Sequence, residues 1–201
     1  MRLDLQGKAF GPRAVLGPLS LTAGRGQRLA VLGPSGIGKS TLLRIVAGLD
    51  HAFAGHLSGD DRVAMVFQEP TLLPWRPALQ NITIPTGCDA ATAGALMAQV
   101  GLAGREAQFP RQLSLGQQRR LALARAFAAR PDILLMDEPF ASLDPDTADR
   151  MIALTAGLLD RSGAGLILVT HDAEEPARLG ARPLILSGSP ATLGPAPTDA
   201  R

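Results

Sequence analysis

The chain of 201 residues is long enough for one compact domain with a hydrophobic core and too short for two large domains. Hydrophobic residues make up 46% of it and charged residues 19%, which excludes a disordered polypeptide. Its net charge is only +2, so we expect no nucleic-acid partner, because such a protein would carry a concentrated basic stripe.

Cysteine content and hydropathy indicate where the protein works. Cys88 is the only cysteine, so neither an intramolecular disulfide nor a cysteine metal cluster can form. No uninterrupted apolar run approaches the roughly 18 residues that a membrane span needs, and residues 1–5 (MRLDL) lack the apolar core of a signal peptide. We therefore expect a cytoplasmic protein that is held at a membrane, if at all, by a partner.

The first 32 residues read as antiparallel β structure. Apolar and polar residues alternate over residues 2–5 and 19–22, with Phe10 between the two segments. Residues 28–32 (RLAVL) then form a short apolar run typical of a buried strand.

The next stretch, residues 33–41 (GPSGIGKST), fits the phosphate-binding pattern G-x-x-x-x-G-K-[ST]. It follows the strand and precedes a segment with helical spacing, which argues against a chance glycine-rich turn. A helix N-terminus presents unpaired backbone N–H groups, and glycines let them approach a phosphate closely. We therefore predict a nucleotide site formed by Gly33, Ser35, Gly36, Gly38, Lys39, Ser40 and Thr41.

Three more strands are expected, each followed by polar side chains. Residues 63–67 lead to Gln68, residues 133–136 lead to Asp137 and Glu138, and residues 165–170 lead to His171. Between the first two, residues 71–128 read as mainly helical, with a helix near 90–100, a loop at 111–117 and a helix from 118 to about 129. The residues from Ser187 onward, rich in Pro, Gly, Ala and Ser, are expected to fray.

Buried strands that alternate with helices indicate an α/β fold with a mostly parallel sheet covered on both faces. Ligands bind at the carboxyl ends of such strands, so these polar side chains should meet near the glycine loop. Asp137 would then hold Mg²⁺ and Glu138 would polarise an attacking water. An isolated Asp-Glu pair could equally cap a helix, but this pair follows an apolar strand in a chain that has a phosphate loop.

Residues 113–117 (LSLGQ) with the helix that follows them resemble the LSGGQ signature of ABC transporter ATP-binding subunits. Leu115 departs from that signature, which has glycine at this position. The resemblance runs from the first strand to about Arg182, and it implies a P-loop NTPase fold. That fold has a RecA-like, mostly parallel sheet core, an antiparallel β subdomain and an inserted α-helical subdomain. Residues 1–201 would be one domain, with the core at 1–70 and 129–201 and the helical subdomain at 71–128.

The resemblance also implies roles for single residues. Ser114, Gly116 and Gln117 would serve the γ-phosphate of ATP held by a second copy of the chain in a head-to-tail dimer, and Asp144 would cross that interface. Within one copy, Gln68 would touch Mg²⁺ and water, and His171 would contact the γ-phosphate. Phe10 would stack on adenine, where relatives usually have tyrosine, although a core phenylalanine remains an alternative.

The resemblance finally implies that the chain is the energy-coupling ATPase of a transporter. We expect this transporter to be an importer of the nitrate, sulfonate, taurine or thiamine-precursor type. A transmembrane permease would dock near residues 72–76 (LLPWR), although Trp75 could instead pack in the core, and an external solute-binding protein could belong to the same system. The main alternative is a soluble ABC ATPase that acts on DNA or ribosomes. A P-loop kinase is opposed by the signature segment and by Glu138 beside Asp137.

Overall fold

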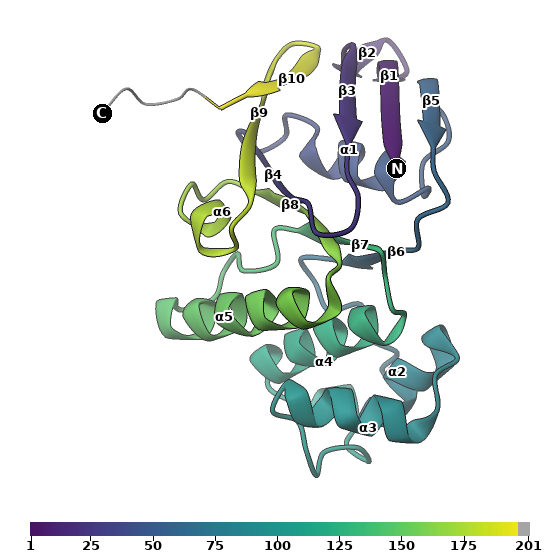
Figure 1. Cartoon of the computed structure of the whole chain (residues 1–201), viewed down its shortest axis with the longest axis vertical. Helices are drawn as coiled ribbons and strands as arrows, with labels where there is room; N and C mark the ends of the chain where they lie inside the picture. The colour runs from purple at the N-terminus through teal and green to yellow at the C-terminus, as the bar shows by residue number, and fades with distance from the viewer. Residues whose placement is uncertain (197–201) are drawn as a thin grey trace.

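The computed structural model describes residues 1–196, which form a mixed sheet with helices on both faces (Figure 1). The strands run in the spatial order β3-β1-β2-β10-β9-β4-β8-β7-β6, and β5 pairs with β1. Their bounds are β1 (Arg2–Phe10), β2 (Arg13–Leu16), β3 (Leu19–Thr22), β4 (Arg28–Leu32), β5 (Ala54–Ser58), β6 (Val63–Val66), β7 (Ile133–Asp137), β8 (Gly165–Thr170), β9 (Arg182–Gly188) and β10 (Ala191–Pro195).

The strands β9, β4, β8, β7 and β6 run parallel to one another. In this half the residue pairs Val66–Met136 and Asp137–Val169 lie in register near the carboxyl ends. The polar residues that follow these strands are therefore delivered to one edge, as the sequence predicts.

The other half of the sheet is antiparallel. Strand β1 pairs antiparallel with β2, β3 and β5, which confirms the antiparallel structure predicted for residues 2–22. For residues 28–32 that prediction is wrong, because β4 pairs parallel with β8 and β9. Strand β10 joins the halves, because it is antiparallel to β9 and parallel to β2.

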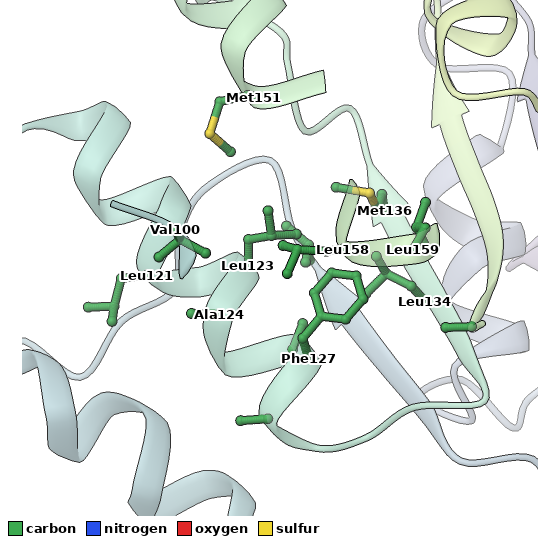
Figure 2. Close-up of a cluster of buried hydrophobic side chains, with 14 of the residues drawn as sticks. Val100, Leu121, Leu123, Ala124, Phe127, Leu134, Met136, Met151, Leu158 and Leu159 are labelled. Atoms are coloured by element: carbon green, nitrogen blue, oxygen red, sulfur yellow. The ribbon is translucent and has the colours of Figure 1, made fainter. Parts of the chain in front are cut away.

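Alternate residues of the central strands supply two separate cores. The helices are α1 (Lys39–Val46), α2 (Ala78–Thr86), α3 (Ala90–Gln99), α4 (Leu115–Ala128), α5 (Pro145–Ser162) and α6 (Glu175–Arg178). From β7, Ile133 and Leu135 face the cluster that contains α1. Leu134 and Met136 face the opposite cluster, where side chains of α4 and α5 cover the sheet (Figure 2). The central strand is thus buried on both faces.

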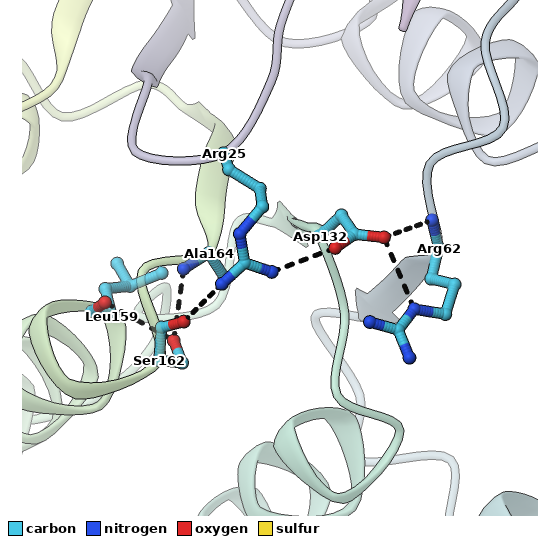
Figure 3. Close-up of polar contacts among 6 residues, drawn as sticks. All are labelled: Arg25, Arg62, Asp132, Leu159, Ser162 and Ala164. Carbon is cyan, nitrogen blue, oxygen red and sulfur yellow. Dashed lines mark hydrogen bonds and ion pairs between the residues drawn. The ribbon is translucent and has the colours of Figure 1, made fainter.

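A charged cluster joins strands at the end of the sheet opposite the carboxyl ends (Figure 3). Asp132, just before β7, accepts hydrogen bonds from the Arg62 backbone N at 3.0 Å and from Arg25 Nη1 at 2.9 Å. Arg25 also donates to the Ser162 carbonyl at 2.7 Å. The hydrogen bonds from Arg62 and then from Arg25 hold the pKa of Asp132 well below its ordinary value. This cluster fixes the starts of β6 and β7 and the end of α5.

Two expectations about local structure are wrong. Helix α4 begins at Leu115 and not at residue 118, because Ser114 and Gln117 cap it reciprocally. The segment expected to fray from Ser187 instead continues β9 to Gly188 and forms β10, since ladder hydrogen bonds to β9 offset its Gly and Pro content. The part of that expectation that concerns residues 197–201 lies outside the described residues.

Candidate active site

The loop between β4 and α1 has the geometry of an anion cradle. Gly38 caps α1 with φ of +114°, and a Cβ there would lie 2.8 Å from Leu16 Cδ2, so only glycine fits this position without strain. Lys39 Nζ donates to the carbonyls of Gly33 at 2.8 Å and Pro34 at 3.2 Å. The lysine charge is therefore folded back over the loop, and the free N–H groups of α1 point to the same place.

A hydroxyl and a carboxylate meet beside this loop. Ser40 Oγ donates to Asp137 Oδ1 at 3.1 Å, which links the first turn of α1 to the end of β7. Burial raises the pKa of Asp137, and the charge of Glu138 raises it further, while the Ser40 hydrogen bond and the Lys39 charge oppose this increase. A cation bound here would favour the ionised carboxylate.

The oxygen atoms of Ser40 and Asp137 fit Mg²⁺, which takes one or two protein oxygens and completes its shell with phosphate and water. Within residues 1–196, no group of three or more His, Cys, Asp or Glu side chains is arranged to hold a metal ion.

Glu138 lies between the phosphate loop and His171. Its Oε1 is 3.3 Å from Lys39 Nζ and its Oε2 is 3.2 Å from His171 Nδ1. The backbone of Glu138 is left-handed, with φ of +44°, and its N–H donates to the Val169 carbonyl of β8 at 2.9 Å. Backbone conformation and strand pairing together therefore aim the carboxylate at the loop.

One cavity of about 510 Å³ brings most of the predicted residues together. Gln68 reaches it from the end of β6 and Phe10 from the end of β1, opposite the phosphate loop. Its predicted lining residues are Phe10, Ser35, Gly36, Gly38, Lys39, Ser40, Thr41, Gln68, Asp137 and Glu138. Gly33 and His171 do not line it, but they contact Lys39 and Glu138, which do.

The cavity also has two lining residues that the sequence reasoning missed, Arg13 and Val15. Both belong to β2, which pairs with β1 so that Arg13 lies opposite Phe10. No motif marks them, and only their alternation after Phe10 could have indicated them. Phe10 itself has 55% of its surface exposed, so the core-phenylalanine alternative is wrong.

The signature segment forms a second, separate cavity of about 460 Å³. Ser114 Oγ accepts from the Gln117 N–H at 3.3 Å, and Gln117 Oε1 accepts from the Ser114 N–H at 2.9 Å. Gly116 and Asp144 line the same cavity, and Asp144 caps α5 by accepting from the Thr147 N–H at 3.0 Å. This cavity shares no lining residue with the first one.

The loop after Gln68 is attached to the helix that carries the signature segment. Arg125 of α4 donates to the Thr71 carbonyl at 2.9 Å and to the Pro70 carbonyl at 3.1 Å. Farther along this loop, Trp75 has 68% of its surface exposed. The alternative in which Trp75 packs in the core is therefore wrong, and the loop presents an aromatic side chain to the outside.

Comparison with known families identifies the arrangement. The family model described as ABC transporter matches residues 16–141, which include the phosphate loop, the signature segment and the Asp137–Glu138 pair. The chain belongs to the ABC transporter family. It is an ATP-binding cassette of that family, and the predicted resemblance and ATPase class are confirmed.

Curated relatives of this ABC cassette include two with the same description. The aliphatic sulfonates import ATP-binding protein SsuB 2 of Streptomyces avermitilis is 48% identical over 190 residues, covering 92% of this chain and 76% of that protein. The protein of that name from Nocardia farcinica is 49% identical over 185 residues, covering 89% and 76%.

Solved structures confirm the predicted fold class of the cassette. A dimeric ATP-binding cassette in a post-hydrolysis state, bound to ADP and Pi, superposes with a TM-score of 0.79 at 28% identity, covering 96% of each chain. A dimeric bacterial ABC transporter cassette gives 0.77 at 31% identity, covering 92% of this chain and 94% of that one. Among the helices of residues 1–196, none combines the length and apolarity that crossing a membrane requires.

Proposed function

We propose that this ABC cassette is the energy-coupling ATPase of an importer for aliphatic sulfonates or similar small solutes, in the class that includes nitrate, taurine and thiamine precursors. The observation that carries the ATPase function is the chain of contacts Lys39–Glu138–His171 at one edge of the phosphate cavity. The relatives named as sulfonate import proteins support the cargo class. None of the relatives reported above is named for an action on DNA or ribosomes, so the soluble alternative is not favoured.

The proposed division of labour follows from the contacts. Lys39 neutralises the β- and γ-phosphates, while Gly33, Ser35, Gly36, Gly38 and Thr41 shape the cradle around them. Ser40 and Asp137 hold Mg²⁺, with Gln68 beside them, and the metal neutralises charge on the phosphates. Phe10 presents its exposed ring to adenine.

Glu138 is the proposed general base. Its carboxylate lies within hydrogen-bond distance of His171, so that histidine can orient a water or the γ-phosphate while Glu138 accepts a proton. Lys39 Nζ lies 3.3 Å from that carboxylate in the resting site. When phosphate binds, it competes with Glu138 for that lysine.

The second cavity supports a head-to-tail dimer. Ser114, Gly116 and Gln117 form a capped helix N-terminus, which attracts anions, yet the phosphate cavity of the same molecule lies elsewhere. In the proposed dimer these residues approach the γ-phosphate held by the other copy, with Asp144 at the interface. Two ATP molecules would then be enclosed, and ATP would favour the closed state because it is bound by both copies.

We assign residues 1–70 and 129–201 to the ATP-binding core and residues 71–128 to a helical subdomain. The mutual contacts of α2, α3 and α4 support this division. Trp75, exposed on the loop that enters the helical part, is the proposed contact with a transmembrane permease. The subunit would then work peripherally on the cytoplasmic face of the membrane, with an external solute-binding protein as a further component of the system.

The test is co-purification from detergent-solubilised membranes, comparing the wild-type chain with Trp75→Ser. The proposal predicts a polytopic membrane protein in stoichiometric amount with wild type and much less with the variant. A soluble nucleic-acid or ribosomal partner, with nothing from the membrane, would refute the transport function. Lys39→Ala, which should lose both ATP affinity and uptake of a labelled aliphatic sulfonate by cells, tests the coupling.

A further inference from the structure

A buried lysine lies against the face of the exposed ring that the ATP site uses. Lys8 has only 4% of its surface exposed, and its Nζ lies 4.6 Å from the centroid of the Phe10 ring. A cation at this distance over an aromatic face attracts the ring through its quadrupole. Phe10 lacks the hydroxyl with which a tyrosine could be anchored, so the contact with Lys8 is what restrains the ring.

Lys8 is in turn fixed to the segment that follows α1. Its Nζ donates at 2.8 Å to Asp50 Oδ1 and at 2.8 Å to the Ala52 carbonyl. Asp50 is itself attached to the end of α1, because its backbone N–H donates to the Arg44 carbonyl at 3.2 Å. The hydrogen bond from Lys8 lowers the pKa of Asp50.

Phe10 lies between two hollows. It lines the phosphate cavity together with Arg13 and Val15. Phe10 also lines a neighbouring hollow of about 610 Å³, to which the Lys8 partners Asp50 and Ala52 contribute. Lys8 lines neither hollow, and 55% of the Phe10 surface is exposed, so the contact with the lysine leaves part of the ring accessible to a ligand.

We propose that Lys8 is a positioning residue for the nucleotide base. It holds the Phe10 ring in the orientation that stacks on adenine, and through Asp50 it ties the ring to the far end of the helix whose N-terminus binds the phosphates. This inference rests on the proposed ATP-binding function. It attributes the part of the ATP affinity that depends on the adenine base to a residue that does not touch the nucleotide.

The contact between Lys8 and Phe10 should affect the binding of the nucleotide base and not that of the phosphates. A cation over an aromatic ring is attracted by the ring quadrupole and so restricts the ring's orientation, which favours stacking with a purine. The phosphates, held at the other end of α1, do not feel this contact directly. Loss of Lys8 should therefore weaken the binding of ATP and leave the binding of a ligand without a base unchanged.

The experiment compares ATP with inorganic tripolyphosphate by calorimetry in EDTA, which prevents hydrolysis. For Lys8→Met we expect ATP affinity to fall about 3- to 10-fold, with tripolyphosphate affinity unchanged. In steady-state hydrolysis the same variant should raise KM for ATP with little change in kcat. Lys8→Arg keeps the cation and should restore most of the ATP affinity.

A double-mutant cycle decides whether Lys8 acts through the ring. In a Phe10→Leu background, Lys8→Met should have almost no further effect on ATP affinity. Equal losses for ATP and tripolyphosphate, or an undiminished effect of Lys8→Met without Phe10, would overturn the inference and leave Lys8 a general structural residue. Unchanged ATP affinity in Lys8→Met would overturn it as well.

Two further results keep the inference separate from the proposed function. If Lys8→Met does not fold, Asp50→Asn can replace it, because this variant weakens the contact that anchors Lys8 without removing the lysine. A loss of affinity for ATP alone would then support the inference. An equal loss for ATP and tripolyphosphate would overturn it. If wild type binds neither ATP nor tripolyphosphate, the nucleotide function itself falls. If wild type binds both equally well, the phosphate site stands and the base platform is refuted.

Discussion

Replacement of Glu138 with glutamine should separate ATP binding from hydrolysis. The amide has the shape of the carboxylate. Its oxygen can therefore keep the contact that Glu138 makes with Lys39 at 3.3 Å, and the fold should be unaffected. The variant cannot accept a proton at neutral pH. The expected loss in kcat is about 10²- to 10⁴-fold, the usual contribution of a general base, equivalent to about 3–5 kcal/mol of barrier.

The structure also predicts what happens to affinity. In the resting site Glu138 competes with phosphate for the buried Lys39, because that lysine is 4% exposed and has no carboxylate closer than Glu138 among its described contacts. Removal of the negative charge should leave ATP affinity equal or higher. With Mg-ATP, the variant should accumulate as an ATP-bound dimer.

The assay combines phosphate release with light scattering of the eluting protein. Glu174→Gln is the control, since that carboxylate is exposed beyond His171 and should leave kcat unchanged. A fall in kcat of less than tenfold for Glu138→Gln would show that another group accepts the proton. A purely monomeric variant with ATP bound would contradict the two-copy site.

Three further changes test the fold around the site. Leu134→Ala, in a fully buried position of β7, should lower the free energy of unfolding by about 3–5 kcal/mol in a denaturant titration, whereas Leu49→Ala, at a 60% exposed position, should change it by less than about 0.5 kcal/mol. Asp132→Asn should lower the free energy of unfolding at pH 7. Because folding lowers the pKa of Asp132, the difference in this free energy between variant and wild type should shrink as pH falls below about 3.9. A difference that stays constant down to pH 2.5 would contradict the ion-pair argument. Gly33→Ala places a Cβ 2.6 Å from the Leu186 carbonyl oxygen, so the loop must shift. This shift should lower the free energy of unfolding by about 1–3 kcal/mol and weaken ATP binding. An ATP affinity equal to that of wild type in a titration would refute the tight fit.

The sequence was most informative where local chemistry and long-range structure agree. The apolar run before Asp137 predicts β7 because a strand buried on both faces needs continuous hydrophobic residues, and the structure has that strand at Ile133–Asp137. The glycine loop predicts the anion cradle because its φ requirement at Gly38 is strictly local. Both features follow from short-range rules, so no knowledge of the packing was needed.

Other features depend on distant residues, and the sequence reasoning missed them. Helix α2 contains Pro85 one residue before its end, so propensity alone does not indicate it; Asn81, fully buried, holds it by bonding the Leu73 backbone. Strand β10 exists because β9 and β2 pair with it. The lining residue Arg13 is placed by the pairing of β2 with β1, where it lies opposite Phe10. Each of these is decided by tertiary contacts.

The cluster around Asp132 and the carboxylate of Asp137 lie at opposite ends of the same strand, β7. Five residues of strand correspond to about 17 Å, which is roughly twice the distance over which physiological salt screens exposed charges. Arg25 and Arg62 at the far end are more than half exposed, so changes of charge at these arginines should have little effect on the electrostatic potential at the nucleotide. Charges at this end can therefore be redesigned for stability with little change in catalysis.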